Sequence, residues 1–290
     1  MGMGEALAMA GRLLTLIVAT GGLLAVAEWA APEGGRRRTR DAIESRRHLG
    51  FIALYVGVAT AVAALLLQAQ GLVAGDGLAP RIQALPGAAQ VALALLLADV
   101  VSYGLHRGAH RYAWWWRLHV VHHRATDVRW WTAYRAHPAN LAIDHLVPAG
   151  VLLLVGFGPL PLAGRAIIVT VVALFAHADV EVPDRWLRYV VATPGYHRTH
   201  HEVDRTGANF ALVLPLLDIL GGTADFSRRE ERRFGLDGTG SAAGDPPLPT
   251  HQATSVARDR HAAQGRTHTP TQNENTLTSP ASTAAEARLP

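Results

Sequence analysis

The sequence predicts an all-α, integral-membrane helical bundle of about three spans plus a helical hairpin, with a cytoplasmic, histidine-rich helical cap and a disordered C-terminal tail. Two observations support this fold class: long apolar runs almost without charge, and histidines repeated at helical spacing. Of the 290 residues, 49% are apolar and only 17% are charged, below the usual quarter. The chain contains no cysteine, which excludes disulfides, thiolate zinc sites and cysteine-ligated iron–sulfur clusters within it.

The first apolar run, residues 13–32, has about the length needed to cross ~30 Å of hydrocarbon. Its alternative interpretation is a cleaved signal peptide, because AVA followed by EWA resembles a small-residue cleavage site. The next stretch, residues 34–48, is dense in arginine. Because it adjoins two apolar runs, the positive-inside rule predicts that it is cytoplasmic.

A second span is expected over residues 49–73, and the connection at 74–88 contains a single arginine, as expected on the opposite side. A third apolar run, 89–105, leads directly into His106 and contains Asp99. An aspartate within a span is costly and usually functional or paired. Three crossings from an outside N-terminus place the first histidines at the cytoplasmic face.

Residues 106–138 are rich in tryptophan, arginine and histidine, which is typical of a cap at the membrane surface. Residues 141–176 are apolar again and are interrupted by glycines and prolines. This pattern predicts a hairpin, spanning or re-entrant, that returns to the same side. Residues 183–235 are mixed in composition and carry the last histidines, whereas residues 238–290 have few large apolar side chains and predict disorder.

Eight histidines form three boxes with helical spacing. They are His106 and His110 as HxxxH, His119, His122 and His123 as HxxHH, and His197, His200 and His201 as HxxHH. Residues three and four apart share one face of a helix, so each box is expected to direct its imidazoles at one point. Neutral imidazole is a good ligand for iron, copper and zinc. Eight nitrogens exceed the four that a tetrahedral zinc takes, and predict two metal ions side by side.

Three further histidines lie outside the boxes. His177 in FAHADV and His137 in RAHPAN are additional ligand candidates. His145 follows Asp144 in an apolar run and is interpreted as structural or headgroup-facing.

At these residues the chain resembles the fatty acid hydroxylase superfamily, in its sterol desaturase branch of integral-membrane di-iron oxidoreductases. The resemblance covers residues from about 95 to 223. It rests on an ordered set of strings, namely HRGAH, WRLHVVHH, TAYRAHP, FAHADV, TPGYHRTHH and NFALVLPLLDILGGT. The chain departs from the family pattern at four places. These are Ala139-Asn140 after HP, Phe210-Ala211 after Asn209, Leu217-Asp218 in place of Trp-Asp, and Gly222-Thr223 in place of Phe-Gly-Thr.

The resemblance implies that the eight box histidines bind two irons, that His177 completes the set, and that His137 lies close by. It also implies that Asn209 and Asp218 support the ligands, with no catalytic side chain beyond the ligands themselves. Zinc is expected to replace iron in some purified protein. The implied activity is the O2-dependent hydroxylation or desaturation of a sterol, fatty acyl lipid or related apolar substrate. The corresponding division is an N-terminal membrane part over 1–88, a catalytic domain over 89–235 and a tail over 236–290.

Abstraction of hydrogen from an unactivated C–H bond requires a cofactor, which agrees with a metal pair. Oxygen activation also needs electrons, and the chain has neither cysteines for a cluster nor a G-x-G-x-x-G nucleotide fingerprint. The expected partners are therefore a bilayer lipid, O2 and a separate ferredoxin, cytochrome or reductase. All 27 basic residues are arginine, a composition that suggests a high-GC bacterium and an inner-membrane location. The net charge of +4 suits a membrane surface and does not indicate nucleic acid.

Two alternatives remain open at this stage. A carotenoid hydroxylase or ketolase uses similar boxes and differs in the shape of the substrate pocket. A non-enzymatic membrane protein that holds structural zinc or transports metal would need ionisable residues distributed through its spans. Only Asp99 and Asp144 lie deep in the apolar runs, which favours the enzyme. The carbon that is oxidised and the choice between alcohol and alkene are not determined by the sequence.

Overall fold

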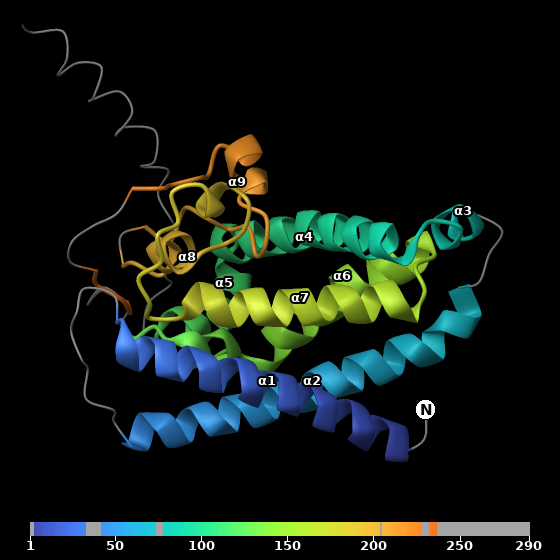
Figure 1. The fold of residues 1–290 in the computed structure, drawn as a ribbon, viewed down its shortest axis with the longest axis horizontal. Helices are drawn as coiled ribbons and strands as arrows, with labels where there is room; N and C mark the ends of the chain where they lie inside the picture. Colours follow the sequence, from blue (N-terminus) through green and yellow to red (C-terminus); the bar gives the residue numbers. More distant parts are fainter. Residues whose placement is uncertain (1–2, 33–41, 74–77, 204, 228–231, 237–290) are drawn as a thin grey trace, which may run out of the picture. The chain divides into compact units, whose positions relative to one another are not determined.

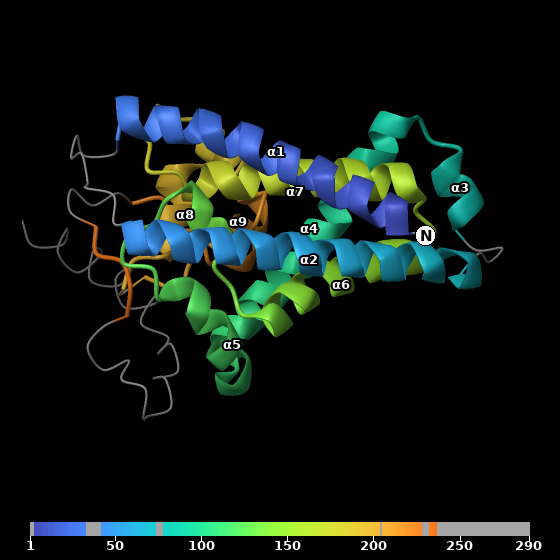
Figure 2. The ribbon, with the colours of Figure 1, turned by 90° about the horizontal axis from the view of Figure 1, so that it is seen from below.

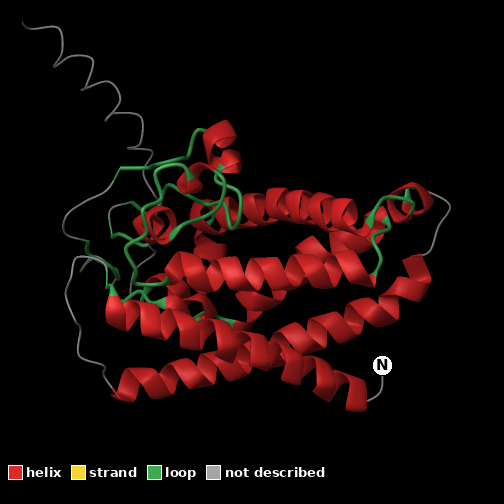
Figure 3. Cartoon of the chain, in the orientation of Figure 1, coloured by secondary structure: helices red, strands yellow, loops and turns green. Residues whose placement is uncertain are grey.

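The computed structural model describes residues 3–32, 42–73, 78–203, 205–227 and 232–236, and this part of the chain is helical without a β-strand. Its elements in order are α1 (Met3–Ala30), α2 (Ala42–Val73), α3 (Ala79–Gln83), α4 (Gly87–Arg111), α5 (Ala113–His123), η2 (Trp130–Tyr134), α6 (Pro138–Val155), α7 (Pro159–His177), η3 (Leu187–Tyr189), α8 (Pro194–His200) and α9 (Leu216–Gly221). Figures 1 and 3 show this arrangement. The all-α prediction is confirmed. The predicted disordered tail lies outside the described residues.

Five helices of the described part are long and apolar enough to cross a membrane. The segments are Leu7–Ala30, Arg47–Ala69, Gly87–Arg111, Pro138–Val155 and Pro159–His177. At a rise of 1.5 Å per residue, even the shortest of them reaches about 27 Å, close to the thickness of the hydrocarbon core. The long helices lie alongside one another in both views (Figures 1 and 2). The predicted three spans plus a hairpin are confirmed as five helices with the length and composition of membrane spans.

The hairpin between α6 and α7 turns at Gly156, which has φ of 104° and caps the end of α6. A Cβ at this position would also collide with Ala79, at the start of α3. Glycine is therefore required twice here, for the left-handed backbone and for the close approach of α3. Pro159 then opens α7, where a missing N–H costs nothing.

Helices α4 and α7 lie side by side and run in the same direction. Gly87 at the start of α4 is beside Leu160, and a Cβ on Gly164 would come within 2.8 Å of Val91. The third span was expected to end at residue 105, but α4 continues unbroken to Arg111, because neither proline nor an extended residue interrupts it before Tyr112. The first histidine box is therefore the end of a span helix and not part of a separate cap.

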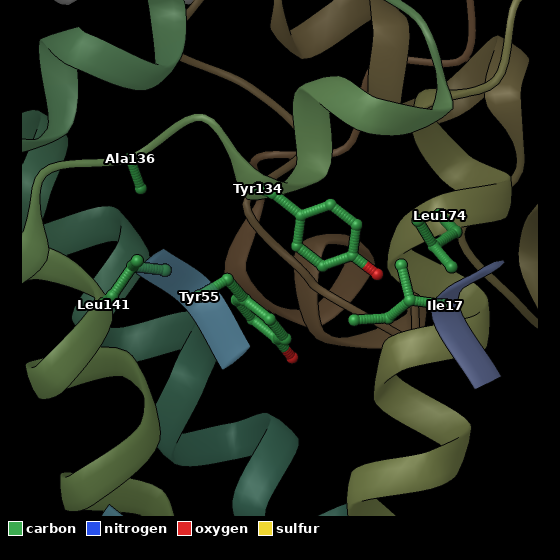
Figure 4. Packing of buried hydrophobic residues seen from close by; sticks show 6 residues of the cluster. All are labelled: Ile17, Tyr55, Tyr134, Ala136, Leu141 and Leu174. Atoms are coloured by element: carbon green, nitrogen blue, oxygen red, sulfur yellow. The ribbon is translucent and has the colours of Figure 1, made fainter. Parts of the chain in front are cut away.

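The N-terminal helices pack onto the rest of the bundle through a buried cluster. Its members are Ile17, Tyr55, Tyr134, Ala136, Leu141 and Leu174, and Figure 4 shows the two tyrosine rings between the flanking aliphatic side chains. The rings of Tyr55 and Tyr134 have centroids 4.6 Å apart. This cluster joins α1, α2, η2, α6 and α7, and these contacts favour a retained first span over a cleaved signal peptide.

The end of α1 is fixed by Glu28, whose carboxylate is buried. It accepts hydrogen bonds from the backbone N–H of Trp130 at 3.0 Å and of Asp179 at 3.0 Å. Arg129 lies 3.8 Å from the same carboxylate. Glu28 thus holds together two loops, one that follows α5 and one that follows α7.

Replacing Glu28 with alanine is expected to destabilise the protein by about 2–4 kcal/mol, because two buried backbone N–H groups lose their acceptor. The free energy of unfolding in mixed detergent micelles measures the effect. Alanine at the exposed Glu181 serves as the control and should change the stability by less than about 0.5 kcal/mol. Equal stabilities for the two variants would contradict the role of Glu28.

Candidate metal centre

Nine histidines gather into two groups at the end of the bundle where α4, α5, α7 and α8 meet. The first group contains His106, His110, His119, His123 and His200, and the second contains His122, His177, His197 and His201. Within each group the ligand atoms lie within 4.8 Å of one another, a spacing suited to one metal ion. The two groups adjoin, since the rings of His123 and His201 have centroids 4.7 Å apart.

Both HxxHH boxes divide their histidines between the two groups. On α5, His119 and His123 belong to the first group and His122 to the second. At 3.6 residues per turn, neighbouring residues such as His122 and His123 point about 100° apart. The expectation that each box aims at one point is therefore wrong for these two boxes. It holds for His106 and His110, which both lie in the first group.

Backbone carbonyls orient four of the rings through their Nδ1 atoms. His106 pairs with the carbonyl of Phe210 at 2.7 Å and His200 with that of Ala208 at 2.7 Å. In the second group, His122 pairs with the carbonyl of Arg135 at 3.1 Å and His177 with that of Ala173 at 2.7 Å. A carbonyl only accepts, so Nδ1–H donates, and the lone pair of each ring is on Nε2. This arrangement is typical of metal-binding histidines.

Many ring nitrogens of the two groups are buried and lack a hydrogen-bond partner. In the first group they include both nitrogens of His110, His119 and His123 and the Nε2 atoms of His106 and His200. A buried polar atom without a partner is costly. Metal coordination would remove this cost, and an all-imidazole donor set suits iron, copper or zinc. The residues present therefore fit the metal pair predicted from the sequence.

Six of the grouped histidines belong to the two HxxHH boxes, and burial lowers the pKa of each well below the ordinary value of 6.5. These are His119, His122, His123, His197, His200 and His201. Repulsion from neighbouring imidazoles lowers each pKa further. The rings are therefore neutral near pH 7, the form that binds metal.

Acid is expected to destabilise the metal-free protein. The unfolded histidines take up protons below about pH 6.5 while the folded ones do not, so stability falls as the pH drops, by up to ~1.4 kcal/mol per pH unit for each histidine. Unfolding of the metal-free protein at pH 7.5, 6.5 and 5.5 measures the slope. The stability should be nearly constant between pH 7.5 and 8.5, where these groups do not titrate. A flat profile down to pH 5.5 would contradict the burial of neutral imidazoles.

Asp218 and Asn209, predicted to support the ligands, organise the loop behind the first group. Asp218 accepts hydrogen bonds from the backbone N–H of Phe210 at 2.9 Å and of Ala211 at 2.6 Å, and from the hydroxyl of Tyr196. Asp218 therefore fixes the segment whose Phe210 carbonyl orients His106.

Asn209 occupies the left-handed region with φ of 58°, a conformation that asparagine tolerates better than most residues. Its side-chain amide donates to the carbonyls of Tyr196 at 2.9 Å and Asp225 at 2.8 Å, and its oxygen accepts from the Asp225 N–H at 2.7 Å. Asn209 thus joins the loop after α9 to α8.

His137 and His145 lie outside both groups. His137 is the N-cap of α6, and its Nδ1 accepts a hydrogen bond from the Ala139 N–H at 3.1 Å. The HP string explains this position, since Pro138 occupies the first turn of α6. The ring of His145 packs edge-on against Tyr55, in agreement with a structural role. A supporting role for His137 at the metals stays a prediction.

Arg198 was not among the predicted site residues, although it lies inside the last histidine box and is 2% exposed. It forms an ion pair with Asp179 at 2.7 Å and donates to the carbonyl of Val128. This pair connects α8 to the loop after α7 and to the loop after α5. The signal was present, because an arginine between ligand histidines on a short helix has to be accommodated in the same buried environment.

Comparison with known proteins identifies the part of the chain that carries the centre. Residues 91–223 match the family profile described as fatty acid hydroxylase. This segment is similar to the fatty acid hydroxylase family. It contains all nine grouped histidines together with Asn209 and Asp218. The predicted resemblance to this family is confirmed, whereas the sterol desaturase branch and the domain boundaries at residues 88 and 235 stay predictions.

Several curated proteins are similar to part of the chain. A very-long-chain aldehyde decarbonylase of Oryza sativa subsp. indica is 32% identical over 178 residues, 56% of this chain and 28% of the relative. An ornithine lipid hydroxylase of Rhizobium tropici is 28% identical over 148 residues, 48% of this chain and 42% of the relative. The chain thus spans less than half the length of either relative. No solved structure matches the chain.

Proposed function

We propose that the protein is a membrane-bound di-iron oxidoreductase that uses O2 and electrons from a separate donor to hydroxylate or desaturate a lipid. The observation that carries this proposal is the pair of adjoining all-histidine groups at the end of apolar helices. The fatty acid hydroxylase family supports an oxidative lipid enzyme over a metal transporter.

In this proposal the nine grouped histidines hold two irons, five at one position and four at the other. A bound iron pair supplies the oxygen activation that attack on an unactivated C–H bond requires, which no side chain can supply. The protein contributes binding and orientation: the carbonyls of Phe210, Ala208 and Arg135 set the direction of the rings. Surrounding side chains exclude water from the four-histidine group, since His177, His197 and His201 are each less than 4% exposed.

The substrate is proposed to be a sterol, fatty acyl lipid or related apolar molecule taken from the bilayer. The names of two relatives, an ornithine lipid hydroxylase and a very-long-chain aldehyde decarbonylase, support a substrate with a long hydrocarbon chain. The five span-capable helices would place the centre next to such molecules. A carotenoid would fit the same argument and is included in the test below.

The electron donor is proposed to be a ferredoxin, cytochrome or reductase that docks on the cytoplasmic face of a bacterial inner membrane. Exposed arginines surround the end of α4 and α5 beside the centre, namely Arg107, Arg111, Arg117 and Arg124. A basic surface of this kind favours association with an acidic donor protein.

The decisive experiment is product analysis after incubation of the iron-loaded protein in proteoliposomes with 18O2 and a ferredoxin–reductase pair. Sterols, fatty acyl lipids and carotenoids are supplied in parallel, and products are read by mass spectrometry. We expect one class to gain an 18O-labelled hydroxyl or to lose two hydrogens. Absence of any oxidised product, together with metal flux across the same vesicles, would replace this proposal with transport.

A further inference from the structure

The segment that closes the metal centre, residues 207–223, carries a single charged residue, Asp218, which is 0% exposed. Three of its large side chains are exposed instead: Leu216 is 49%, Ile219 43% and Leu220 75% exposed. These three side chains belong to α9. Residues 207–223 have no exposed charge beside this apolar face. Such a face is unfavourable in water and is typical of a surface that contacts lipid or protein.

In Figure 1, α9 lies beside the half of α4 that ends at Arg111. The hydroxyl of Tyr103 on α4 lies 3.0 Å from that of Thr223, just after α9. A Cβ on Gly221 would collide with the same Tyr103 hydroxyl, so the side chain of Tyr103 reaches α9 where glycine leaves room for it. On the N-terminal side of α9, Asp99 of α4 accepts hydrogen bonds from the backbone N–H of Val213 at 3.1 Å and of Leu214 at 2.7 Å.

These contacts set the depth of α9 relative to the spans. At 1.5 Å per residue, Asp99 lies about 18 Å and Tyr103 about 24 Å along α4 from Gly87. Gly87 is beside Leu160. Both residues lie at the start of their helices, at the end of the bundle away from the histidine groups. Hydrocarbon about 30 Å thick that begins near this end reaches past Asp99 and Tyr103. The exposed side chains of α9, Leu216, Ile219 and Leu220, are therefore expected at the depth of the last turns of the membrane-spanning helices.

The hydrogen bonds of the preceding loop support this depth. Residues 211–214 are not helical, and irregular backbone at membrane depth is stable only when the protein itself satisfies its polar groups. Two buried carboxylates do so, since Asp218 accepts from the N–H of Phe210 and Ala211, and Asp99 from those of Val213 and Leu214. This also explains why an aspartate is tolerated in the α4 span. In contact with water, these four donors would not need buried carboxylates.

We propose that residues 210–222 form a re-entrant element embedded in the bilayer, with Leu216, Ile219 and Leu220 in contact with lipid acyl chains. At the inner end of this element, the ring of Phe210 packs against those of His106, His110 and His200, with centroids 5.6, 5.3 and 5.7 Å away. The element thus separates hydrocarbon from the five-histidine group by one layer of side chains. That a lipid substrate approaches here rests on the proposed function, whereas the lipid contact itself does not.

The absence of cysteine in the chain makes the test direct, because any introduced cysteine is the single labelling site. Leu220→Cys and Leu216→Cys are labelled with bimane, and the protein is reconstituted in vesicles of phosphatidylcholine with or without brominated acyl chains. Leu154→Cys on the α6 span, 72% exposed, is the lipid-side reference. Arg124→Cys after α5, also exposed, is the water-side reference. Circular dichroism establishes that each variant is folded.

We expect labels at Leu220 and Leu216 to behave like the label at Leu154. Their emission should be blue-shifted, and brominated acyl chains should quench their fluorescence. Iodide added to the water should quench them much less than the label at Arg124. Strong quenching by iodide would overturn the proposal in favour of a water-exposed cap. A label protected from both quenchers would also overturn it, in favour of a protein contact. Because the readout needs neither metal nor turnover, failure of the proposed enzymatic function would leave this result unaffected.

Discussion

Alanine at His123 or at His201 is expected to lower lipid oxidation by at least ~10²-fold, because each variant removes one ligand from a different group. Loss even of residues that only orient metal ligands costs 10–100-fold. His123 belongs to the five-histidine group and His201 to the four-histidine group. Both variants should lose activity, since the two positions act as one centre. Initial rates and metal content, measured on the same preparations, test the expectation.

The matched control is His145→Gln, which changes a histidine in α6 that lies outside both groups and packs against Tyr55. It should retain its metal and most of its turnover. Turnover of His123→Ala or His201→Ala equal to that of the control would show that the affected group is not part of the active centre.

Alanine at Asp218 is expected to destabilise the protein by about 4 kcal/mol or more, since several buried donors lose one acceptor and each such loss costs roughly 1–3 kcal/mol. The donors are the N–H groups of Phe210 and Ala211 and the hydroxyls of Tyr196 and Thr223. Release of Phe210 should also weaken metal binding in the five-histidine group, because its carbonyl orients His106. Unfolding in mixed micelles and metal affinity are the measurements.

Asp225→Ala provides the comparison for Asp218, because Asp225 is only half-buried. Its hydrogen bonds to Arg205 and Ser227 overcome the effect of burial and lower the pKa of its carboxyl. Its loss should cost less than half as much as the loss of Asp218. Similar costs for the two variants would contradict the central role of Asp218 in this loop.

Much of the candidate centre could be predicted because its histidines lie on helices. The spacing of the histidines along α4, α5 and α8 identifies the candidates without any tertiary information. The apolar runs likewise identify the five long helices, and Gly156 with Pro159 places the turn of the hairpin. The family resemblance added His177 to the set, and the structure places it in the four-histidine group.

Other features could not be predicted because they join residues far apart in the chain. Glu28 reaches the N–H of Asp179, and Asp99 reaches those of Val213 and Leu214. No local spacing links such partners, since a carboxylate that accepts from a distant loop leaves no periodic pattern. The division of each HxxHH box between two groups depends on how α5 and α8 face each other. Side-chain spacing along one helix does not contain that information.

The central claim, two metal ions held by nine histidines, is tested most directly by the metal content of the detergent-purified protein. It is compared with the double variant His122→Ala/His200→Ala, which removes one ligand from each group. We predict two iron or zinc ions per chain in the unmodified protein and loss of metal from both positions in the double variant. No bound metal in the unmodified protein, or a content unchanged by the two substitutions, would contradict the account.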